Sequence, residues 1–465
     1  MKSRSKPIDS AMRSGGHGFR WLMSRIKSER ATLLGIAARA WSVGTGLITL
    51  LILSAFYSPE LQGYFYTFYS LVMLQQLFEL GLGQVIIQFA SHEWAHLQED
   101  AAGRLRGGEQ SLSRLASLVR FSVAWFGIAS IFLVILLGAV GLALLDTGEH
   151  ARADIDWQLP WMALSIASGI DLALISFFFL LEGCNKVEEV YFYRFVRSIL
   201  TTVAIWAVIT LGGQLWAPAA GTCAGVIWGG WFLWRRYRHF FANLWVAHSR
   251  TVKIDWRLEI LPMQWRLAVG WISGYFAYSL FTPVLFMTHG PVVAGQMGML
   301  WSIIQALWGV STLIVLVRAP RFGMLVAMRN YTVFNRSAFR TGAVSIGLCM
   351  LGALAIAFGI YLLEILHMPL SRRLLPLDST LIFLAGAVVT QIIGVQAIYL
   401  RAHKREPFFT MSLLSTIMIG ISTLTLGPEF GANGIGLGYL AISLCFSLPA
   451  SIYILRKSQR ELQQQ

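Results

Sequence analysis

The stretch FSVAWFGIASIFLVILLGAVGLALL, residues 121–145, contains 25 residues in succession without a charged side chain. A helix of this length rises by about 37 Å at 1.5 Å per residue, enough to cross a hydrocarbon core of about 30 Å. Lipid offers no hydrogen bonds to peptide groups, so a run of this kind must be helical. The stretch predicts a transmembrane helix, which we place at residues 116–145.

Similar apolar runs recur along the whole chain. Hydrophobic residues make up 56% of the 465 residues, charged residues only 13%, and the mean hydropathy is +0.62. A soluble domain is about 45–50% apolar and about 25% charged. The composition therefore predicts an all-α polytopic membrane protein. We place its twelve transmembrane helices at residues 32–56, 62–90, 116–145, 159–182, 190–212, 215–234, 267–289, 293–317, 340–365, 378–400, 407–427 and 432–455.

The distribution of positive charge predicts the orientation. With a cytoplasmic N-terminus, 33 of the 37 Lys and Arg residues fall on the inner side of the membrane, and only Arg152, Arg372 and Arg373 fall outside. This bias follows the positive-inside rule. The net charge of +14 thus favours contact with anionic lipid over nucleic acid. We expect a multi-pass protein of a bacterial cytoplasmic (inner) membrane with both termini in the cytoplasm.

The longest internal loop divides the chain into two halves. It covers residues 235–266 and separates an N-terminal six-helix lobe, 32–234, from a C-terminal six-helix lobe, 267–455. Residues 1–31 form a basic cytoplasmic segment, either a short amphipathic helix on the inner leaflet or a disordered tail. Residues 456–465 form a cytoplasmic tail.

A faint repeat supports two related lobes. MLQQLFELGLG begins at Met73, and MLWSIIQALWG begins 226 residues later at Met299, so that Glu79 corresponds to Gln305. At the nearby offset of 227, Arg39 corresponds to Arg266. Both halves start on the same side of the membrane, which predicts a pseudo-two-fold axis along the membrane normal.

Several classes of function have no support in the sequence. No nucleotide-binding P-loop, H-E-x-x-H or G-x-S-x-G motif occurs, and the external loops are too short for a catalytic domain. The four cysteines are scattered without metal-ligand spacing. We therefore expect neither an enzyme nor a cofactor or metal site.

Ionisable residues inside spanning helices point to a hydrated interior, because each costs about 2.5–3.5 kcal/mol on insertion scales. Arg39, Glu79 and Asp171 are the three examples. Glu79 shares one arc of about 100° with Gln75, Gln76 and Gly83 on a helix of 3.6 residues per turn. These polar stripes predict helices that line a cavity. The alternative is that Arg39 pairs with Glu79 or Asp171 to lock the bundle.

Asp171 in turn shares a face with Ser168 and Glu182. Arg194 and Arg197 begin the fifth helix and are candidates for the cytoplasmic mouth of the cavity. The planar guanidinium group donates two parallel hydrogen bonds to phosphate. The alternative is that these arginines only set the topology.

In the second half of the chain, Gln305 and Gln391 are weaker candidates for the cavity, since a lone Gln often forms a helix–helix hydrogen bond.

The chain resembles a known transporter family. The resemblance rests on the six-plus-six helices, the basic N-terminus, Arg39 in the first helix, ELGLGQ at 79–84, and the turn LEGCNKVEEVYFYRFVRS at 181–198. These features are similar to the polysaccharide transporters, including Wzx-type O-antigen flippases, of the multidrug/oligosaccharidyl-lipid/polysaccharide exporter superfamily. The resemblance implies an inverted-V bundle with alternating access and a cationic central cavity for a lipid pyrophosphate. Of the cationic pattern, only Arg39 matches.

The leading hypothesis is a flippase for a polyprenyl-diphosphate-linked oligosaccharide that serves lipopolysaccharide, capsule or exopolysaccharide biosynthesis. Arg39, Gln75, Gln76, Arg194, Arg197, Arg266 and Gln305 are the candidate substrate-binding residues, and Glu79 and Asp171 are the candidate sites for a coupling proton or sodium ion. Polysaccharide-assembly proteins are the expected partners, besides membrane lipids. An ion-coupled drug or metabolite antiporter of the same fold is the main alternative, and a non-transporting subunit of an export complex is the third.

Overall fold

The structure is a computed structural model. It describes residues 34–35, 37–38, 40–42, 44–99, 105–145, 155–246, 255–261, 264–265, 268, 278–403 and 407–463. Arg39 and Arg266 lie outside the described residues, as does the basic segment 1–31.

The N-terminal lobe begins with an apolar helix, Ala40–Phe56. The elements that follow are α2 (Pro59–Val72), α3 (Gln75–Glu79), α4 (Leu82–Trp94), the antiparallel strands β1 (Leu97–Glu99) and β2 (Leu105–Gly107), α5 (Glu109–Leu145), α6 (Gln158–Gly183), α7 (Val187–Thr210) and α8 (Trp216–Val246). The small β1–β2 hairpin lies where the sequence predicted only a loop.

A short π-helix, η1 (Trp256–Ile260), lies between the lobes in sequence. The C-terminal lobe contains α10 (Phe281–Ala327), α11 (Tyr331–Ile365), the 3-10 helix η2 (Pro369–Arg373), α12 (Leu377–Ala402), α13 (Phe409–Ala441), the π-helix η3 (Ile442–Ser447) and α14 (Leu448–Gln463). The long α10 and α13 each turn sharply at a glycine with positive φ, Gly290 (φ 85°) and Gly431 (φ 60°). Each therefore contains two limbs, which correspond to two predicted helices.

The protein is an all-α, multi-pass membrane protein with two lobes. Within the described residues, seven helices are long and apolar enough to span a membrane, or eight if the bent segment from Pro59 to Trp94 is one span. With α10 and α13 counted as two limbs each, all twelve predicted helices have described residues, although the first and seventh are described only in part. The predicted fold class is confirmed.

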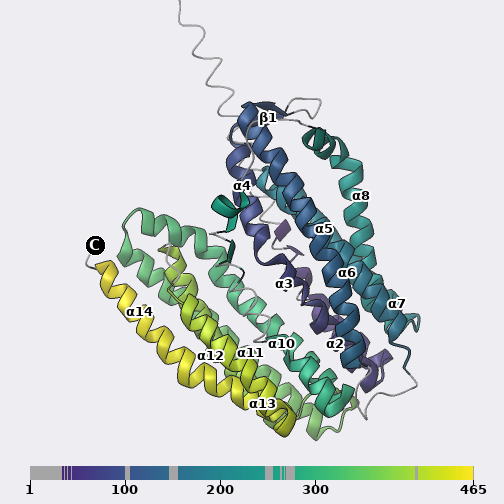
Figure 1. Ribbon diagram of the computed structural model, residues 1–465. Coiled ribbons are helices and arrows are strands. Elements are labelled where there is room, and N and C mark those ends of the chain that lie inside the picture. The colour runs from purple at the N-terminus through teal and green to yellow at the C-terminus, as the bar shows by residue number, and fades with distance from the viewer. Residues whose placement is uncertain are drawn as a thin grey trace, which may run out of the picture.

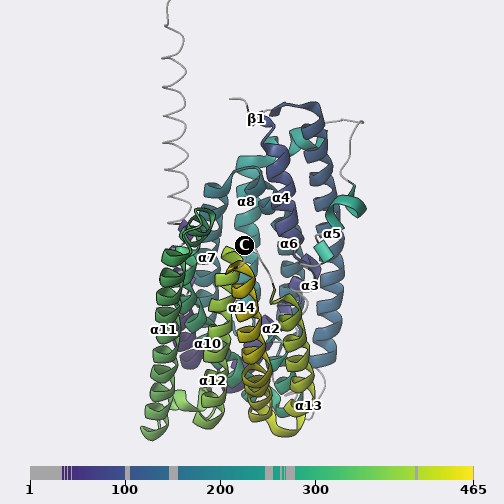
Figure 2. The same cartoon turned by 90° about the vertical axis from the view of Figure 1, so that its left-hand side faces the viewer.

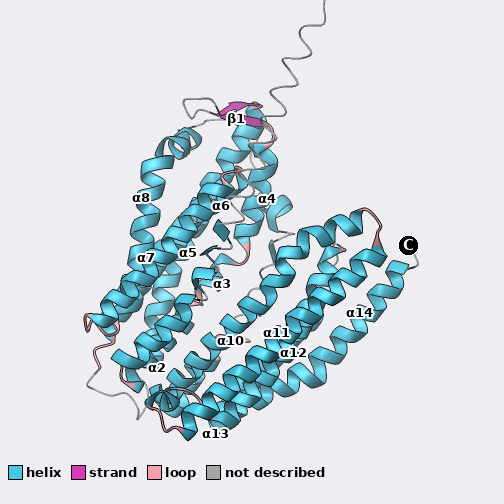
Figure 3. Ribbon diagram, turned by 180° about the vertical axis from the view of Figure 1, so that it is seen from behind, coloured by secondary structure: helices cyan, strands magenta, loops and turns pink. Residues whose placement is uncertain are grey.

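The two lobes meet at one end and diverge toward the other (Figures 1 and 3). At the meeting end, α2 of the N-terminal lobe packs against α10 of the C-terminal lobe. The β1–β2 hairpin and the C-terminus lie toward the diverging end. The sequence predicted a cytoplasmic position for both segments, so the lobes diverge on the predicted cytoplasmic side.

Glycine permits the close approach of the lobes at the meeting end. A Cβ atom on Gly63 of α2 would lie 1.9 Å from the carbonyl oxygen of Pro291, and one on Gly295 would lie 2.8 Å from the Gly63 nitrogen. Gln62 is buried beside them, and its Nε2 donates to the carbonyl oxygens of Gly295 (3.0 Å) and Arg373 (3.1 Å). Backbone contact and buried hydrogen bonds thus hold this end together.

The second predicted helix, 62–90, is wrong as a single helix. Leu80 (φ 48°) and Gly81 (φ 67°) both adopt left-handed conformations, and the chain bends there by 43° between α3 and α4. Gly81 takes this conformation without a Cβ penalty. Gly83 lies on α4 against the Phe179 ring, where a Cβ would be 2.5 Å from Cζ. Gln75, Gln76 and Glu79 lie together on α3, but Gly83 lies beyond the bend on α4, so the predicted arc of four residues is wrong in its last member.

Candidate functional site

A partly buried ion pair joins α6 to α7 in the spanning part of the N-terminal lobe. An Nη2 atom of Arg197 lies 2.8 Å from the Asp171 carboxylate, and the two side chains are 28% and 12% exposed. Space for the guanidinium comes from α8, because Arg197 Nε would lie 2.9 Å from a Cβ on Gly225. One turn further along α8, Gly229 leaves room for the hydroxyl of Tyr193. The glycine face of α8 therefore makes room for the charged face of α7.

A second pair lies nearer the diverging end. Arg194 Nη2 lies 2.6 Å from the Glu182 carboxylate, and the guanidinium lies 5.5 Å from the centroid of the Tyr191 ring. Glu79, at the end of α3, is half-buried and lies close enough to be affected by the charge of Arg194. Sequences far apart in the chain thus bring Glu79, Glu182 and Arg194 into one electrostatic cluster.

Both ion pairs, Arg194–Glu182 and Arg197–Asp171, join the two helices of the α6–α7 hairpin. Its turn contains Asn185 in a left-handed conformation (φ 61°), and the two helices run antiparallel from it. Arg194 reaches toward the turn to Glu182, whereas Arg197 reaches away from it to Asp171. The predicted shared face of Asp171 and Glu182 is confirmed by these two contacts with one neighbouring helix. Ser168, on the same face, is buried and has no hydrogen-bond partner within the described chain.

In the structure Asp171 pairs with Arg197, a partner that the sequence analysis did not predict. The alternative drawn from the sequence paired Arg39 with Glu79 or Asp171, but Asp171 contacts Arg197. In the described part of this region, three carboxylates (Glu79, Asp171, Glu182) face two arginines.

The glutamine candidates fall into two groups. Gln75 and Gln76 are half-buried on α3, next to Glu79, and Gln305 is exposed on α10. Gln391 instead forms a helix–helix hydrogen bond, donating to Ser345 Oγ at 2.9 Å and accepting from Thr312. The helix–helix hydrogen bond expected of a lone Gln is therefore confirmed for Gln391, and the role of Gln305 in the cavity stays a prediction.

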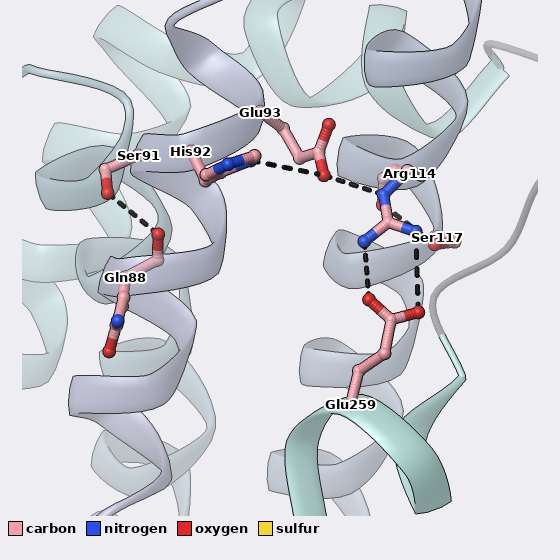
Figure 4. Close-up of polar contacts among 7 residues, drawn as sticks. All are labelled: Gln88, Ser91, His92, Glu93, Arg114, Ser117 and Glu259. Atoms are coloured by element: carbon pink, nitrogen blue, oxygen red, sulfur yellow. Dashed lines mark hydrogen bonds and ion pairs between the residues drawn. The ribbon is translucent and has the colours of Figure 1, made fainter. Parts of the chain in front are cut away.

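A third polar cluster escaped the sequence analysis (Figure 4). Arg114 of α5 contacts Glu93 of α4 through Nε (2.7 Å) and Glu259 of η1 through Nη2 (2.6 Å) and Nη1 (3.4 Å). The Trp256 ring of η1 lies 6.0 Å from Phe121 and 6.1 Å from Trp125 on α5. These contacts attach the interlobe segment to the N-terminal lobe. A separation of 145 residues between Arg114 and Glu259 left no local signal for the pair.

These clusters consist of arginine and carboxylate side chains, which bind ions of opposite charge. Among the described residues, no group of three or more His, Cys, Asp or Glu side chains is placed to hold a metal ion. The guanidinium groups of Arg194 and Arg197 can instead leave their carboxylates to bind an anionic substrate. The carboxylates of Asp171 and Glu182 can bind a cation or a proton.

Comparisons with known proteins place the fold. No family model and no curated protein matches the chain in sequence. Among solved structures, an inward-facing multidrug resistance MATE family transporter of the MOP superfamily has a TM-score of 0.57 at 13% identity, over 92% of this chain and 96% of that one. The lipid II flippase MurJ in an inward closed conformation has a TM-score of 0.56 at 13% identity, over 92% and 87%. An outward-facing MATE transporter of the MOP superfamily has a TM-score of 0.51 at 13% identity, over 94% and 97%.

The chain therefore has the fold of MOP superfamily transporters over nearly its whole length. Its structural neighbours are transporters and a flippase rather than enzymes.

Proposed function

We propose that this protein is a flippase that carries a polyprenyl-diphosphate-linked oligosaccharide across the cytoplasmic membrane by alternating access. One observation carries the proposal. Arg194 and Arg197 lie in a spanning helix, each held by a carboxylate, yet their side chains remain 40% and 28% exposed. Phosphate accepts the guanidinium fork in the same way as carboxylate, so a diphosphate group can replace these partners.

The arrangement of the lobes supports this substrate class. The lobes diverge at the end that the positive charges predict to be cytoplasmic, where lipid-linked saccharides are assembled (Figure 1). A saccharide head would enter between the lobes while the polyprenyl tail stays in lipid. MurJ, one of the solved structures with this fold, is described as a lipid II flippase. The glycan would then feed lipopolysaccharide, capsule or exopolysaccharide assembly proteins.

A flipping assay tests the proposal. Proteoliposomes that contain a fluorescent polyprenyl-diphosphate oligosaccharide report flipping as a change in access of a membrane-impermeant quencher. Arg194→Ala and Arg197→Ala should each slow flipping by about tenfold or more, because a hydrogen bond to a charged group contributes about 1.5–3 kcal/mol. Arg39→Ala, in the first helix, is proposed to have the same effect, and Arg39→Lys should recover part of the rate.

Arg236→Ala is the matched control. Arg236 pairs with Glu189 at 3.0 Å, but its side chain is 59% exposed and lies beyond the apolar part of α8. This variant should flip lipid at the parental rate. Parental flipping by a folded Arg194→Ala/Arg197→Ala double variant would contradict the phosphate-binding role.

An ion-coupled drug or metabolite antiporter is the second candidate. The excess of carboxylates over arginines in the described site favours a cationic substrate. Such an antiporter should export a fluorescent organic cation against a proton or sodium gradient. It should not move the lipid-linked saccharide, so the same proteoliposomes separate the two candidates.

A further inference from the structure

We propose that the α10–α11 hairpin forms a binding surface for the headgroups of anionic phospholipids. The surface, called here the arginine hairpin, consists of Arg321 near the end of α10, Arg329 in the turn, and Arg336 and Arg340 at the start of α11. All four residues are exposed. This inference stands independently of the transported substrate.

The sequence around the arginine hairpin lacks negative charge. No Asp or Glu occurs between Glu259 and Glu364, and every charged residue in that interval is an arginine. Within the described chain, no carboxylate lies within 4.0 Å of the four arginines of the hairpin. The N-terminal lobe differs, because carboxylates there pair with Arg114, Lys186, Arg194, Arg197 and Arg236. The positive charge of the hairpin is therefore free to attract anions from outside the chain.

Contacts between the two helices hold the arginines in one place. Arg318 Nη1 donates to Thr341 Oγ1 at 2.7 Å, and the rings of Phe322 and Phe334 pack at 5.7 Å. These contacts bring the end of α10 and the start of α11 side by side. Arg336 and Arg340 are one turn apart on the same helix face, where side chains are about 6 Å apart.

Large apolar side chains are exposed on the same hairpin. Met328 is 74% exposed and Phe339 is 79% exposed, and Val344 continues the apolar surface further along α11. Exposed aliphatic and aromatic groups next to arginines suit the boundary between acyl chains and phosphate groups. A nucleic acid would neutralise the arginines but leave these apolar groups without a partner, whereas a phospholipid supplies a phosphate group and acyl chains at the boundary where a membrane-spanning helix ends. The combination identifies a lipid as the occupant.

The position of the hairpin separates it from the interlobe surface. Figure 2 shows α11 at the outer edge of the C-terminal lobe. Arg336 and Arg340 lie on the face of α11 opposite the buried residues Phe334 and Ala338. The arginine hairpin therefore faces the surrounding bilayer and does not form part of the proposed transport path.

Native mass spectrometry of the full-length protein measures the predicted lipid binding. The protein in detergent is titrated with phosphatidylglycerol, and with phosphatidylethanolamine as the headgroup without net charge. The triple variant Arg329→Gln/Arg336→Gln/Arg340→Gln should lower the affinity for phosphatidylglycerol by about tenfold or more, because each basic residue near an anionic surface contributes to binding. Binding of phosphatidylethanolamine should not change. The corresponding triple lysine variant keeps the charge and should retain most of the affinity.

The matched control removes the same number of charges from the same end of the molecule. Arg235→Gln/Arg236→Gln/Arg238→Gln on α8 should change the affinity by less than about twofold, since Arg236 is already paired and Arg238 lies over Trp234. Equal losses in the two triple glutamine variants would show diffuse charge attraction and overturn the proposal. An unchanged affinity in the hairpin variant would show that these arginines serve only to orient the chain.

A measurement on the parent protein guards against misfolded variants. A photoactivatable phosphatidylglycerol in native-like bilayers should crosslink to peptides from residues 321–344 more than to peptides from residues 235–246. Crosslinks spread evenly over both segments would overturn the proposed surface.

Discussion

At the scale of single residues, two carboxylates on the spanning helix α6, Asp171 and Glu182, each lie next to an arginine of α7. The sequence indicated Asp171 because a carboxyl group is costly in lipid, and Glu182 because it extends the same helix face. Their partners, Arg197 and Arg194, were predicted for a cytoplasmic mouth, yet Arg197 reaches into the lobe as far as Asp171. The guanidinium of a long arginine side chain can lie well away from its own Cα. Helical periodicity predicts the face on which the Cα lies, but not the position of the charge.

The first prediction concerns the stability of the Asp171–Arg197 pair. Arg197→Met or Asp171→Leu alone should destabilise the protein by about 3 kcal/mol, because either change leaves an uncompensated charge with little exposure. The double variant Asp171→Leu/Arg197→Met should recover most of that loss. Thermal unfolding in detergent measures all three. If each single variant is as stable as the parent, the pair is hydrated and does not hold α6 to α7.

The second prediction concerns ion coupling through Glu79 and Asp171. Proton binding to either carboxyl group would weaken its attraction to Arg194 or Arg197, and so links protonation to the arrangement of α3, α6 and α7. Transport in proteoliposomes should depend on a pH gradient, and this dependence should disappear in Glu79→Gln or Asp171→Asn. Glu189→Gln, in the exposed pair with Arg236, is the control. A normal response to the gradient in both amide variants would assign these carboxyl groups a structural role.

At the scale of elements, helices extend beyond their predicted ends mainly on one side of the protein. α5 starts at Glu109 instead of 116, α8 continues to Val246 instead of 234, and α11 starts at Tyr331 instead of 340. All three extensions lie at the predicted cytoplasmic end. Hydropathy detects the segment that crosses the hydrocarbon core, but a helix can continue into water with charged residues on its surface. At the opposite end, tight turns at Gly212, Gly290 and Gly431 end the helices close to the predicted positions.

The third prediction tests the close packing of α2 on α10. Gly63→Val should separate the lobes at their meeting end, because its Cβ would lie 1.9 Å from the Pro291 carbonyl oxygen. Spin labels at Leu211 and Leu366, both exposed, should then report longer and broader distances by pulsed EPR. Gly359→Val on α11 is the matched control, since a Cβ there meets no atom within 4 Å. Parental distances in Gly63→Val would mean that the interface tolerates a side chain.

The fourth prediction concerns the pH dependence of the η1 contact. Hydrogen bonds from Arg114 hold the pKa of Glu259 below its ordinary value of 4.5. A carboxyl group with a lowered pKa stabilises the contact above its ordinary pKa, and the stabilisation is lost as the pH falls through the lowered value. A spin label at Leu261 should therefore be restrained at pH 7 and become more mobile only when the pH falls below the ordinary pKa of 4.5, through the lowered pKa of Glu259.

Two variants define the outcome for η1. Arg114→Gln should make the label at Leu261 mobile already at pH 7, because Glu259 loses its charged partner. Glu259→Gln should remove the change in mobility between pH 7 and low pH. A label that is equally restrained in Arg114→Gln would show that the packing of Trp256 alone holds η1 in place.

At the scale of the whole molecule, contacts between distant loops hold the lobes together at the predicted external end. Arg373, one of only three basic residues predicted outside, donates to the carbonyl oxygens of Ser54 and Tyr57 at the end of the first helix. Cations stabilise the negative end of a helix dipole and its unpaired carbonyl groups. This role accounts for Arg373 on the side where basic residues are rare.

The fifth prediction tests the orientation in the membrane. Single cysteines in a background without the four natural cysteines should react with an impermeant reagent from outside at Glu149 and Leu375. Cysteines at Gly107, Ser249 and Gln463 should react only after permeabilisation, because 33 of 37 basic residues lie on their side. External labelling at Ser249 would overturn the six-plus-six organisation. External labelling at Gly107 would reverse the assignment of the diverging end.

The sequence by itself determined the fold class, the number of spanning helices and their approximate positions. These properties depend on the length and polarity of local segments, since each spanning helix must satisfy its own backbone hydrogen bonds. The shared face of Asp171 and Glu182 and the helix–helix role of Gln391 were also local predictions, and contacts with neighbouring helices confirm them.

Only the tertiary structure decided which residues meet. The bend at Leu80 and Gly81 separates Gly83 from Gln75, Gln76 and Glu79. Helical periodicity did not predict this bend, because it contains no signal for a positive φ at a leucine. The partners of Asp171, Arg114 and Gln62 come from other helices, up to 311 residues away in sequence. Lipid gives little preference for one apolar helix contact over another, so close packing at glycines and polar contacts between helices choose the arrangement.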